Sequence, residues 1–198
     1  MLFAKIISYL FHPLLLPTFG LFLIFHLDAG LWLPSLQMQL FLYLLTLTAT
    51  FFLPLLISLL LLKTKQIASL EMSTKEERKI PYLAASIFYF SESYLLIKLE
   101  IPALIQAMIL GATVLVVSVL IINLFWKISS HMVGIGGLCG MMIAVSSRLQ
   151  INMHFVFIAL FLIAGLVAFS RLKLNAHNPA QVYLGFLLGV AVQIILFL

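Results

Sequence analysis

Long apolar runs repeat along the whole chain, and they limit the folds that this sequence can adopt. A helix needs about 20 apolar residues to cross the hydrocarbon core of a membrane. Runs of roughly that length lie at residues 3–27, 37–62, 81–98, 101–125, 131–148, 152–170 and 179–198. Of the 198 residues, 64% are hydrophobic and 9% are charged, whereas about a quarter of a soluble domain is charged. The sequence therefore predicts an all-α polytopic transmembrane helix bundle of six or seven spans, forming one integral membrane domain over residues 1–198.

The first run carries Lys5 near its start and lacks a clear cleavage site. Because more apolar runs follow, we interpret it as an uncleaved first helix and not as a signal peptide. Pro13 and Pro17 are expected to kink this helix, since proline has no backbone N–H and crowds the preceding turn. Cys139 is the only cysteine of the chain, which excludes an internal disulfide and a cysteine metal site.

The cations are distributed unevenly between the two membrane faces. With seven spans, the N-terminus and the segments 63–80, 126–130 and 171–178 share one face. The Lys and Arg residues of that face are Lys5, Lys63, Lys65, Lys75, Arg78, Lys79, Lys127, Arg171 and Lys173. Lys98 and Arg148 lie near the other face. The positive-inside rule would make the first face cytoplasmic, although cations that bind substrate would bias this count.

The net charge of +5 is thinly spread and forms no basic patch with interleaved aromatic residues. Nucleic acid is therefore not an expected partner, and the cations indicate orientation in the bilayer or an anionic ligand. No feature of the sequence predicts an oligomeric state.

The first of three polar clusters on the cationic face is LEMSTKEERKIPYL, residues 70–83. Ser73 and Glu76 fit a capping box, which predicts a short helix that begins near Thr74. Lys75 and Arg78 are three residues apart and would project from one side of that helix. The alternative is a solvated loop that carries positive-inside charges.

The second cluster is WKISSHMVGIGGLCG, residues 126–140. Ser129 or Ser130 can cap a helix that carries His131 in its first turn. The free N–H groups at such a helix start form an anion site. The glycines that follow allow close packing of neighbouring helices, and they are Gly134, Gly136, Gly137 and Gly140. The alternative is a packing helix with an interfacial histidine.

The third cluster is SRLKLNAHNPAQVYLG, residues 170–185. Asn178 can cap the last helix, and Pro179 suits its first position. His177 then stands at the helix start, and Gln181 lies one turn on, within reach of its ring. The planar guanidinium of Arg171 suits bidentate phosphate recognition. Cations that snorkel at a membrane boundary are the alternative.

Together these clusters resemble the signature of the type-2 phosphatidic acid phosphatase superfamily, the membrane lipid phosphatases related to vanadium haloperoxidases. Ser170-Arg171, five residues and then His177 reproduce the spacing of the third motif, and Gln181 stands where the family has aspartate. ISSH at 128–131 is similar to the second motif but lacks its proline and glycine.

The first motif of that family, Lys, six residues and Arg-Pro, is matched least well. Arg78 is separated from Pro81 by two residues, and Glu71 occupies the lysine position. The resemblance covers residues 71–189, which would form the phosphatase-like core.

The resemblance implies a phosphohistidine mechanism on a membrane lipid phosphate, either an isoprenoid or a glycerolipid phosphate, in a bacterial inner membrane. His177 would attack phosphorus, and His131 would protonate the leaving alcohol and then activate water. The phosphate-binding candidates are Arg78, Arg171, Ser129, Ser130 and Lys75, of which Lys75 would replace the missing lysine. The resemblance implies no metal and no other cofactor, and the lipid tail would lie in the bilayer or between helices.

Gln181 keeps a second function open. Its amide oxygen can fix the tautomer of His177 but contributes no negative charge to it. The alternative to a phosphatase is therefore a catalytically impaired relative that binds lipid phosphate without hydrolysis. A small transporter is a third alternative, which we disfavour because the sequence shows no inverted repeat and no matching pair of helices broken by Gly or Pro.

Glu92 lies inside the third apolar run. Acids within a membrane span are functional candidates by default. A neighbour such as His12 or Tyr94 could satisfy its carboxylate.

Overall fold

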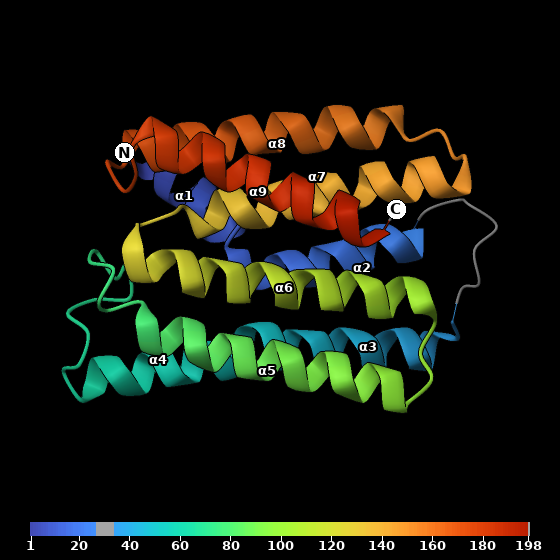
Figure 1. Ribbon diagram of the computed structural model, residues 1–198, viewed down its shortest axis with the longest axis horizontal. Helices are drawn as coiled ribbons and strands as arrows, with labels where there is room; N and C mark the ends of the chain where they lie inside the picture. Colours follow the sequence, from blue (N-terminus) through green and yellow to red (C-terminus); the bar gives the residue numbers. More distant parts are fainter. Residues whose placement is uncertain (27–33, 198) are drawn as a thin grey trace.

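The computed structural model describes residues 1–26 and 34–197. The last residue of the first predicted run and residue 198 lie outside this part of the chain. The elements in chain order are α1 (Leu2–Leu10), η1 (Pro13–Leu15), α2 (Leu16–His26), α3 (Leu36–Leu47), η2 (Thr48–Phe52), α4 (Leu53–Lys63), α5 (Lys79–Lys98), α6 (Ala103–Phe125), α7 (Ser130–Leu149), α8 (His154–Lys173) and α9 (Pro179–Phe197). Every element of the described residues is helical, and the helices lie side by side along one long axis (Figure 1).

Seven helical segments in the described residues are long and apolar enough to cross a membrane. They are Leu2–His26, Leu36–Lys63, Lys79–Lys98, Ala103–Phe125, Ser130–Leu149, His154–Lys173 and Pro179–Phe197. The prediction of an all-α bundle is therefore confirmed, and each predicted run corresponds to one of these segments.

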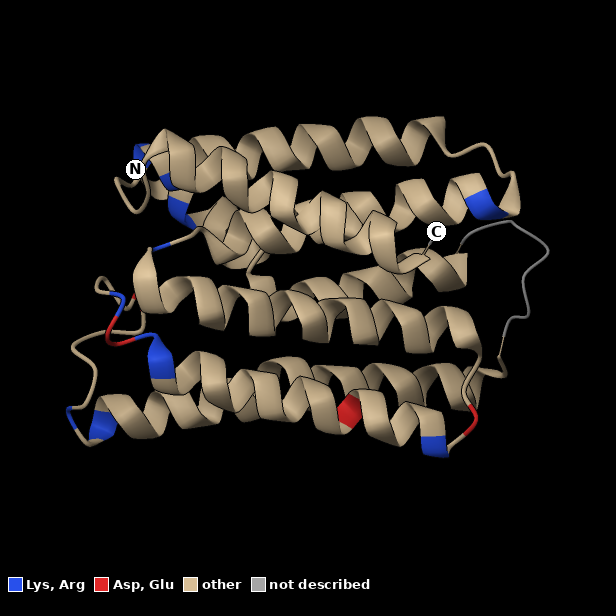
Figure 2. Ribbon diagram, in the orientation of Figure 1, with Lys and Arg blue, Asp and Glu red and all other residues tan. Residues whose placement is uncertain are grey.

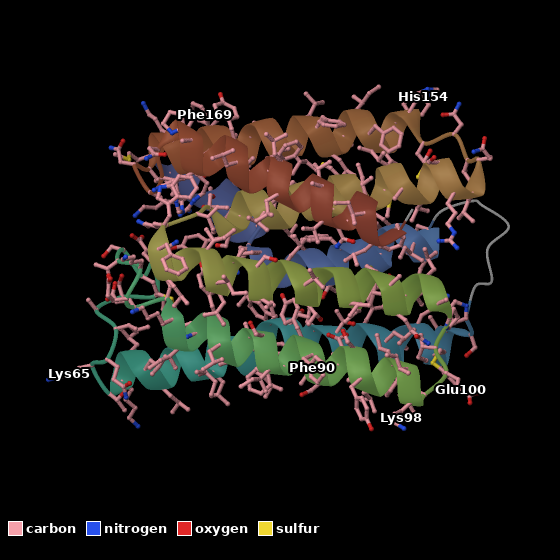
Figure 3. The ribbon with its side chains drawn as sticks, in the orientation of Figure 1. Lys65, Phe90, Lys98, Glu100, His154 and Phe169 are labelled. Atoms are coloured by element: carbon pink, nitrogen blue, oxygen red, sulfur yellow. The ribbon has the colours of Figure 1, made fainter. Side chains whose placement is uncertain are left out.

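The side chains on the outside of the bundle fit a lipid environment. Phe90 and Phe169 point away from the helices (Figure 3) and are 65% and 51% exposed. Lys65 lies at one end of the bundle, and Lys98 lies at the other end. The bundle is thus apolar along its length and polar at its two ends, as a membrane requires.

Most cations gather at the end of the bundle that carries the N-terminus and the connections 64–78, 126–129 and 174–178 (Figure 2). We call this the cationic end. Lys98 and Arg148 lie in the last turns of α5 and α7, at the opposite end. The predicted grouping of the charged segments on one face is confirmed.

The first two spans are both interrupted, and the two breaks lie against each other. α1 ends at Leu10, and α2 resumes after the 3-10 turn η1, which begins at Pro13, so the predicted kink is present. The second span contains the π-helical segment η2, which is followed by Leu53 and Pro54 at the start of α4. The hydroxyl of Thr50 in η2 lies 3.0 Å from the carbonyl oxygen of Leu14 in η1 and 2.8 Å from that of Thr46, one turn earlier. The break in the second span was not predicted.

α7 and α9 pack closely along glycine residues. A Cβ on Gly136 would collide with the carbonyl oxygen of Phe186, and a Cβ on Gly189 would collide with that of Val133. Only glycine lets the two backbones approach so closely. This packing holds the first residues of α7 beside the first residues of α9, where the amide of Ser129 donates to the carbonyl of Gln181 at 3.3 Å.

The segment before α5 differs from our prediction. Residues 74–78 form a bend and turns, and α5 begins at Lys79, so no short helix begins near Thr74. The reciprocal pair is Thr74 and Glu77 instead of Ser73 and Glu76. The Glu77 carboxylate accepts the amide and the hydroxyl of Thr74, each at 3.2 Å, and also the amide of Ala68 at 2.7 Å. Glu77 is favoured because it ties two parts of the loop together.

Candidate active site

His177 lies at the start of α9 and is fixed by the capping of that helix. Asn178 Oδ1 accepts the amide of Gln181 at 2.9 Å, and Gln181 Oε1 accepts the amide of Asn178 at 3.2 Å, so the two residues form a capping box. The same Oε1 lies 3.0 Å from Nδ1 of His177. The predicted roles of Asn178 as the cap and Pro179 as the first helical residue are confirmed.

This arrangement determines the tautomer of His177. A backbone amide only donates, so the atom of Gln181 that accepts it is the amide oxygen. That oxygen can only accept from His177, and Nδ1 must therefore carry the proton. The other ring nitrogen, Nε2, is left with a lone pair, which is the form that a histidine nucleophile needs.

His177 is also kept neutral. Burial, followed by the positive charge of Arg78, lowers its pKa to about 3, although the Gln181 contact opposes the shift. The charges of Arg171 and Lys127 act in the same direction as that of Arg78. His177 is therefore uncharged near pH 7, close to three cations that would attract an anion.

His131 lies in the first turn of α7 and is 8% exposed. Its Nε2 lies 3.1 Å from the carbonyl oxygen of Ser8 in α1, so Nε2 must be the donor. The ring centroid of His131 is 5.3 Å from that of His12, in an edge-to-face arrangement. His131 is also within electrostatic reach of His177 and Arg171. The structure thus brings both predicted histidines to the cationic end.

Arg78, which is buried, and Arg171, which is half-buried, lie next to these histidines. Each has a buried N–H group without a partner among the described residues. Arg171, in the last turn of α8, donates from Nη1 to the hydroxyl of Ser8 at 2.5 Å, while its Nε has no partner. Arg78, directly before α5, donates from Nε to the carbonyl of Met72 at 2.8 Å, while its Nη1 has no partner. Buried donors of this kind require an acceptor, and an oxyanion supplies one.

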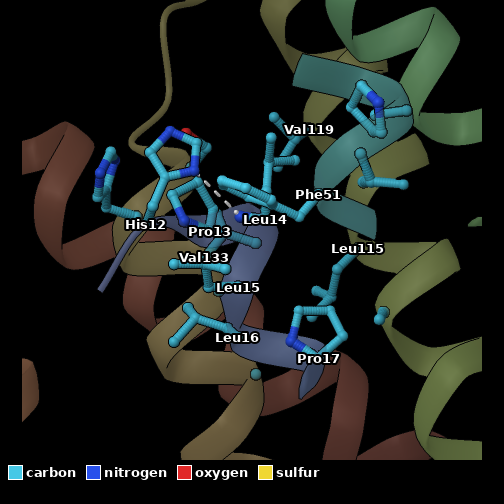
Figure 4. A pocket seen from close by; sticks show the side chains of 18 of the residues that line it. His12, Pro13, Leu14, Leu15, Leu16, Pro17, Phe51, Leu115, Val119 and Val133 are labelled. Carbon is cyan, nitrogen blue, oxygen red and sulfur yellow. Dashed lines mark hydrogen bonds between the residues drawn. The ribbon is translucent and has the colours of Figure 1, made fainter. Parts of the chain in front are cut away.

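Both arginines line a cavity of about 500 Å³ inside the bundle. The polar side chains at its cationic end include His12, Arg78, His131 and Arg171. Figure 4 shows His12 beside the η1 turn, with Phe51, Leu115, Val119 and Val133 around the space that follows. His131 and Met141 both line it and are about 15 Å apart along α7 at 1.5 Å per residue. The cavity thus joins a cationic mouth to a long, mostly apolar interior.

The other predicted site residues are divided between this cavity and its surroundings. Ser130 lines the cavity. Ser129 is the residue before α7, as predicted, but its buried hydroxyl forms no cap bond and has no partner in the described chain. His177 and Gln181 lie outside the group of cavity-lining residues.

The structure does not bring Lys75 to the site. Its ammonium group donates to the carbonyl of Leu124 at the end of α6, at 3.3 Å, where a cation satisfies the helix C-terminus. Lys127 is nearer the site than Lys75, since its positive charge contributes to the lowered pKa of His177. Burial, with the charges of Arg78 and Arg171, lowers the pKa of Lys127. The missing lysine of the family motif is therefore not replaced by Lys75.

Sequence reasoning missed two residues of the site. His12 was considered only as a partner of Glu92, yet it lines the cavity beside His131. Its position directly before Pro13 in an apolar run was the available signal. Nothing in the sequence indicated that Ser8 belongs to the site, because serine is common in membrane helices. Its role is seen only in the structure, where His131 contacts its carbonyl and Arg171 contacts its hydroxyl.

Fold and site together define an integral membrane protein with a cationic, histidine-containing site at one end of its bundle. Among residues 1–26 and 34–197, no group of three or more His, Cys, Asp or Glu residues is placed to hold a metal ion. The chain matches no protein-family model, no curated protein and no solved structure.

Proposed function

We propose that the protein is a membrane lipid phosphatase that hydrolyses an isoprenoid or glycerolipid phosphate through a phosphohistidine intermediate. The substrate phosphate binds at the cationic end, and its apolar chain enters the cavity behind it. The protein acts in a bacterial inner membrane.

The observation that carries this proposal is the pair of buried donors on Arg78 and Arg171. Nη1 of Arg78 and Nε of Arg171 have no acceptor in the described chain. A guanidinium group binds phosphate oxygens through such N–H groups. Both side chains line the cavity, whose interior is apolar. An amphiphile with a phosphate head satisfies the donors and fills the interior at the same time.

The chemistry follows from the two histidines. His177 presents Nε2 as the nucleophile, because Gln181 holds the proton on Nδ1. Its lone pair forms a bond to phosphorus, while the bond from phosphorus to the ester oxygen breaks. The leaving oxygen takes a proton from the imidazolium form of His131. In the second step His131 removes a proton from water, the water oxygen attacks phosphorus, and the electron pair of the P–N bond returns to Nε2.

The capping role of Gln181 favours a second candidate function, binding without hydrolysis. An aspartate would stabilise the cationic phosphohistidine, whereas the glutamine offers only an amide oxygen that it shares with Asn178. His177 also lies outside the group of cavity-lining residues. A protein with these features would hold a lipid phosphate at Arg78 and Arg171 and leave it intact.

Phosphate release separates the two functions. Purified wild-type protein and the His177→Ala variant are incubated with a panel of prenyl and glycerolipid phosphates, and inorganic phosphate is measured. His154→Ala is the matched control, because His154 is exposed at the opposite end of the bundle. Release by wild type and by His154→Ala, but not by His177→Ala, supports hydrolysis.

Equal release by wild type and His177→Ala on every substrate would rule out hydrolysis. Binding is then tested by the melting temperature with added lipid phosphate. An increase that Arg171→Ala abolishes supports the binding protein. The absence of any increase excludes both candidates.

A further inference from the structure

Glu92 is a buried carboxylate that the proposed phosphatase chemistry does not use. It lies in α5 about 9 Å before Lys98 at 1.5 Å per residue, and it is 2% exposed. Its neighbours differ from those that we expected, because Tyr94 is 56% exposed and His12 lies beside His131 instead.

The carboxylate has one partner in the described chain. Oε1 of Glu92 lies 2.5 Å from the hydroxyl of Thr46 in α3, and Oε2 is buried without a partner. An ionised carboxylate in an apolar interior requires a compensating charge or several donors. Neither is supplied by the described residues around Oε2.

The interrupted second span adds further oxygen atoms at this level. Thr46 and Thr50 are 1% and 0% exposed, one turn apart on either side of the start of η2. Pro54 has no N–H and therefore donates no bond to the carbonyls of η2. Tyr89, one turn before Glu92, lies beside Thr50 and is itself buried. Carboxylate, hydroxyl and carbonyl oxygens next to a broken membrane helix are the ligands that alkali cations use.

We propose that Glu92 and Thr46 form a binding site for a monovalent metal cation at the η2 break. One cation neutralises the one carboxylate and gives Oε2 a partner. A divalent ion would leave an excess positive charge beside this single carboxylate. No group of three or more His, Cys, Asp or Glu residues that could hold a metal ion lies here or elsewhere in the described residues. The site is separate from the proposed phosphatase site.

Occupancy of this site would also affect the cavity. Phe51 of η2 and Tyr89 of α5 both line the cavity, and each is close in sequence to a residue of the cation site. Thr50 joins η2 to η1 through the Leu14 carbonyl. A bound cation therefore orders the wall that the two helix breaks share.

The test is thermal unfolding of the purified protein in detergent, with choline chloride replaced by NaCl or KCl at constant ionic strength. Ligand that binds the folded state raises its melting temperature. We expect a rise of roughly 2–4 °C at about five times the dissociation constant for a chain of this size. Glu92→Gln and Thr46→Val should lose this rise, and Glu100→Gln, an exposed acid just after α5, should keep it.

If a variant does not fold, the melting temperatures of the wild-type protein can still overturn the proposal. Equal melting temperatures in choline, Na⁺ and K⁺ overturn the proposal. A cation-dependent rise that is as large in Glu92→Gln and Thr46→Val as in wild type overturns it too. Neither result bears on the phosphatase proposal, which is tested by phosphate release.

Discussion

Gln181 Oε1 lies 3.0 Å from His177 Nδ1 and also accepts the amide of Asn178 at 3.2 Å. One side-chain oxygen therefore completes the capping box of α9 and orients the imidazole ring. A glutamine at this position is explained by helix stability alone. The contact with the His177 ring gives a second explanation: Gln181 takes the place of the aspartate that lipid phosphatases have next to their nucleophilic histidine. Substitutions that keep the cap and change the charge separate these two explanations.

We predict that Gln181→Glu raises the rate of phosphate release at least about 10-fold. Glutamate keeps the side-chain length and the capping contact, and it adds a negative charge next to the ring that becomes cationic during phosphoryl transfer. In a serine protease triad the corresponding loss of charge costs about 10⁴ in turnover, which bounds the size of the effect. Initial rates on a prenyl phosphate measure it.

Gln181→Ala is the companion variant. It removes both the cap and the ring contact, so both the melting temperature and the rate should fall. A rate for Gln181→Glu that equals the wild-type rate, with an unchanged melting temperature, would show that position 181 serves the helix and not the reaction.

The depressed pKa of His177 predicts that acid destabilises the protein. The unfolded chain binds a proton at His177 near pH 6.5, whereas the folded chain does so near pH 3. Stability from this group is therefore complete above pH 6.5 and is lost as the pH falls toward 3. With a folded pKa of about 3, the loss between pH 7 and pH 5 is about 2 kcal/mol. Melting temperatures of wild type and His177→Gln across this range measure it.

His154→Gln is the control for this prediction, because His154 is exposed. Its melting temperature should fall between pH 7 and pH 5 as much as that of wild type. His177→Gln should fall less. If all three proteins lose stability in parallel, His177 is not held in its neutral form by the fold.

The sequence predicted the features that follow from local chemistry. Apolar length located the spans, Pro13 predicted the first break, and the Asn178–Pro179 pair located the start of α9. The contact between His177 and Gln181 was predictable because His177 directly precedes the N-cap Asn178 and Gln181 lies in the first turn of the helix.

The features that were missed depend on contacts between distant segments. The π-helical turn η2 has no local sign besides Pro54, since a proline is as compatible with a simple kink. Lys75 does not reach the site because its ammonium group is held by the carbonyl of Leu124 at the end of α6. Ser8 reaches Arg171 across more than 160 residues of chain, which no periodicity in the sequence encodes.

The orientation of the bundle gives a further prediction. The cationic end carries the N-terminus, and seven candidate spans place the C-terminus at the other end. By the positive-inside rule the cationic end faces the cytoplasm. A C-terminal alkaline phosphatase fusion expressed in bacteria should therefore be active, and a C-terminal green fluorescent protein fusion should be dark. The reverse pattern would place the site on the outer side of the membrane.

The α7–α9 contact predicts opposite effects for two glycine-to-alanine substitutions. A Cβ on Gly189 would collide with backbone atoms of α7, whereas a Cβ on Gly165 in α8 meets nothing within 4 Å. Gly189→Ala should therefore lower stability by about 1–3 kcal/mol, and Gly165→Ala should raise it by about 0.5–1 kcal/mol. Because α7 and α9 also hold His131 and His177, Gly189→Ala should reduce phosphate release as well. Thermal unfolding of both variants measures the changes in stability. Equal stability of the two variants would mean that α7 and α9 are not packed along these glycines.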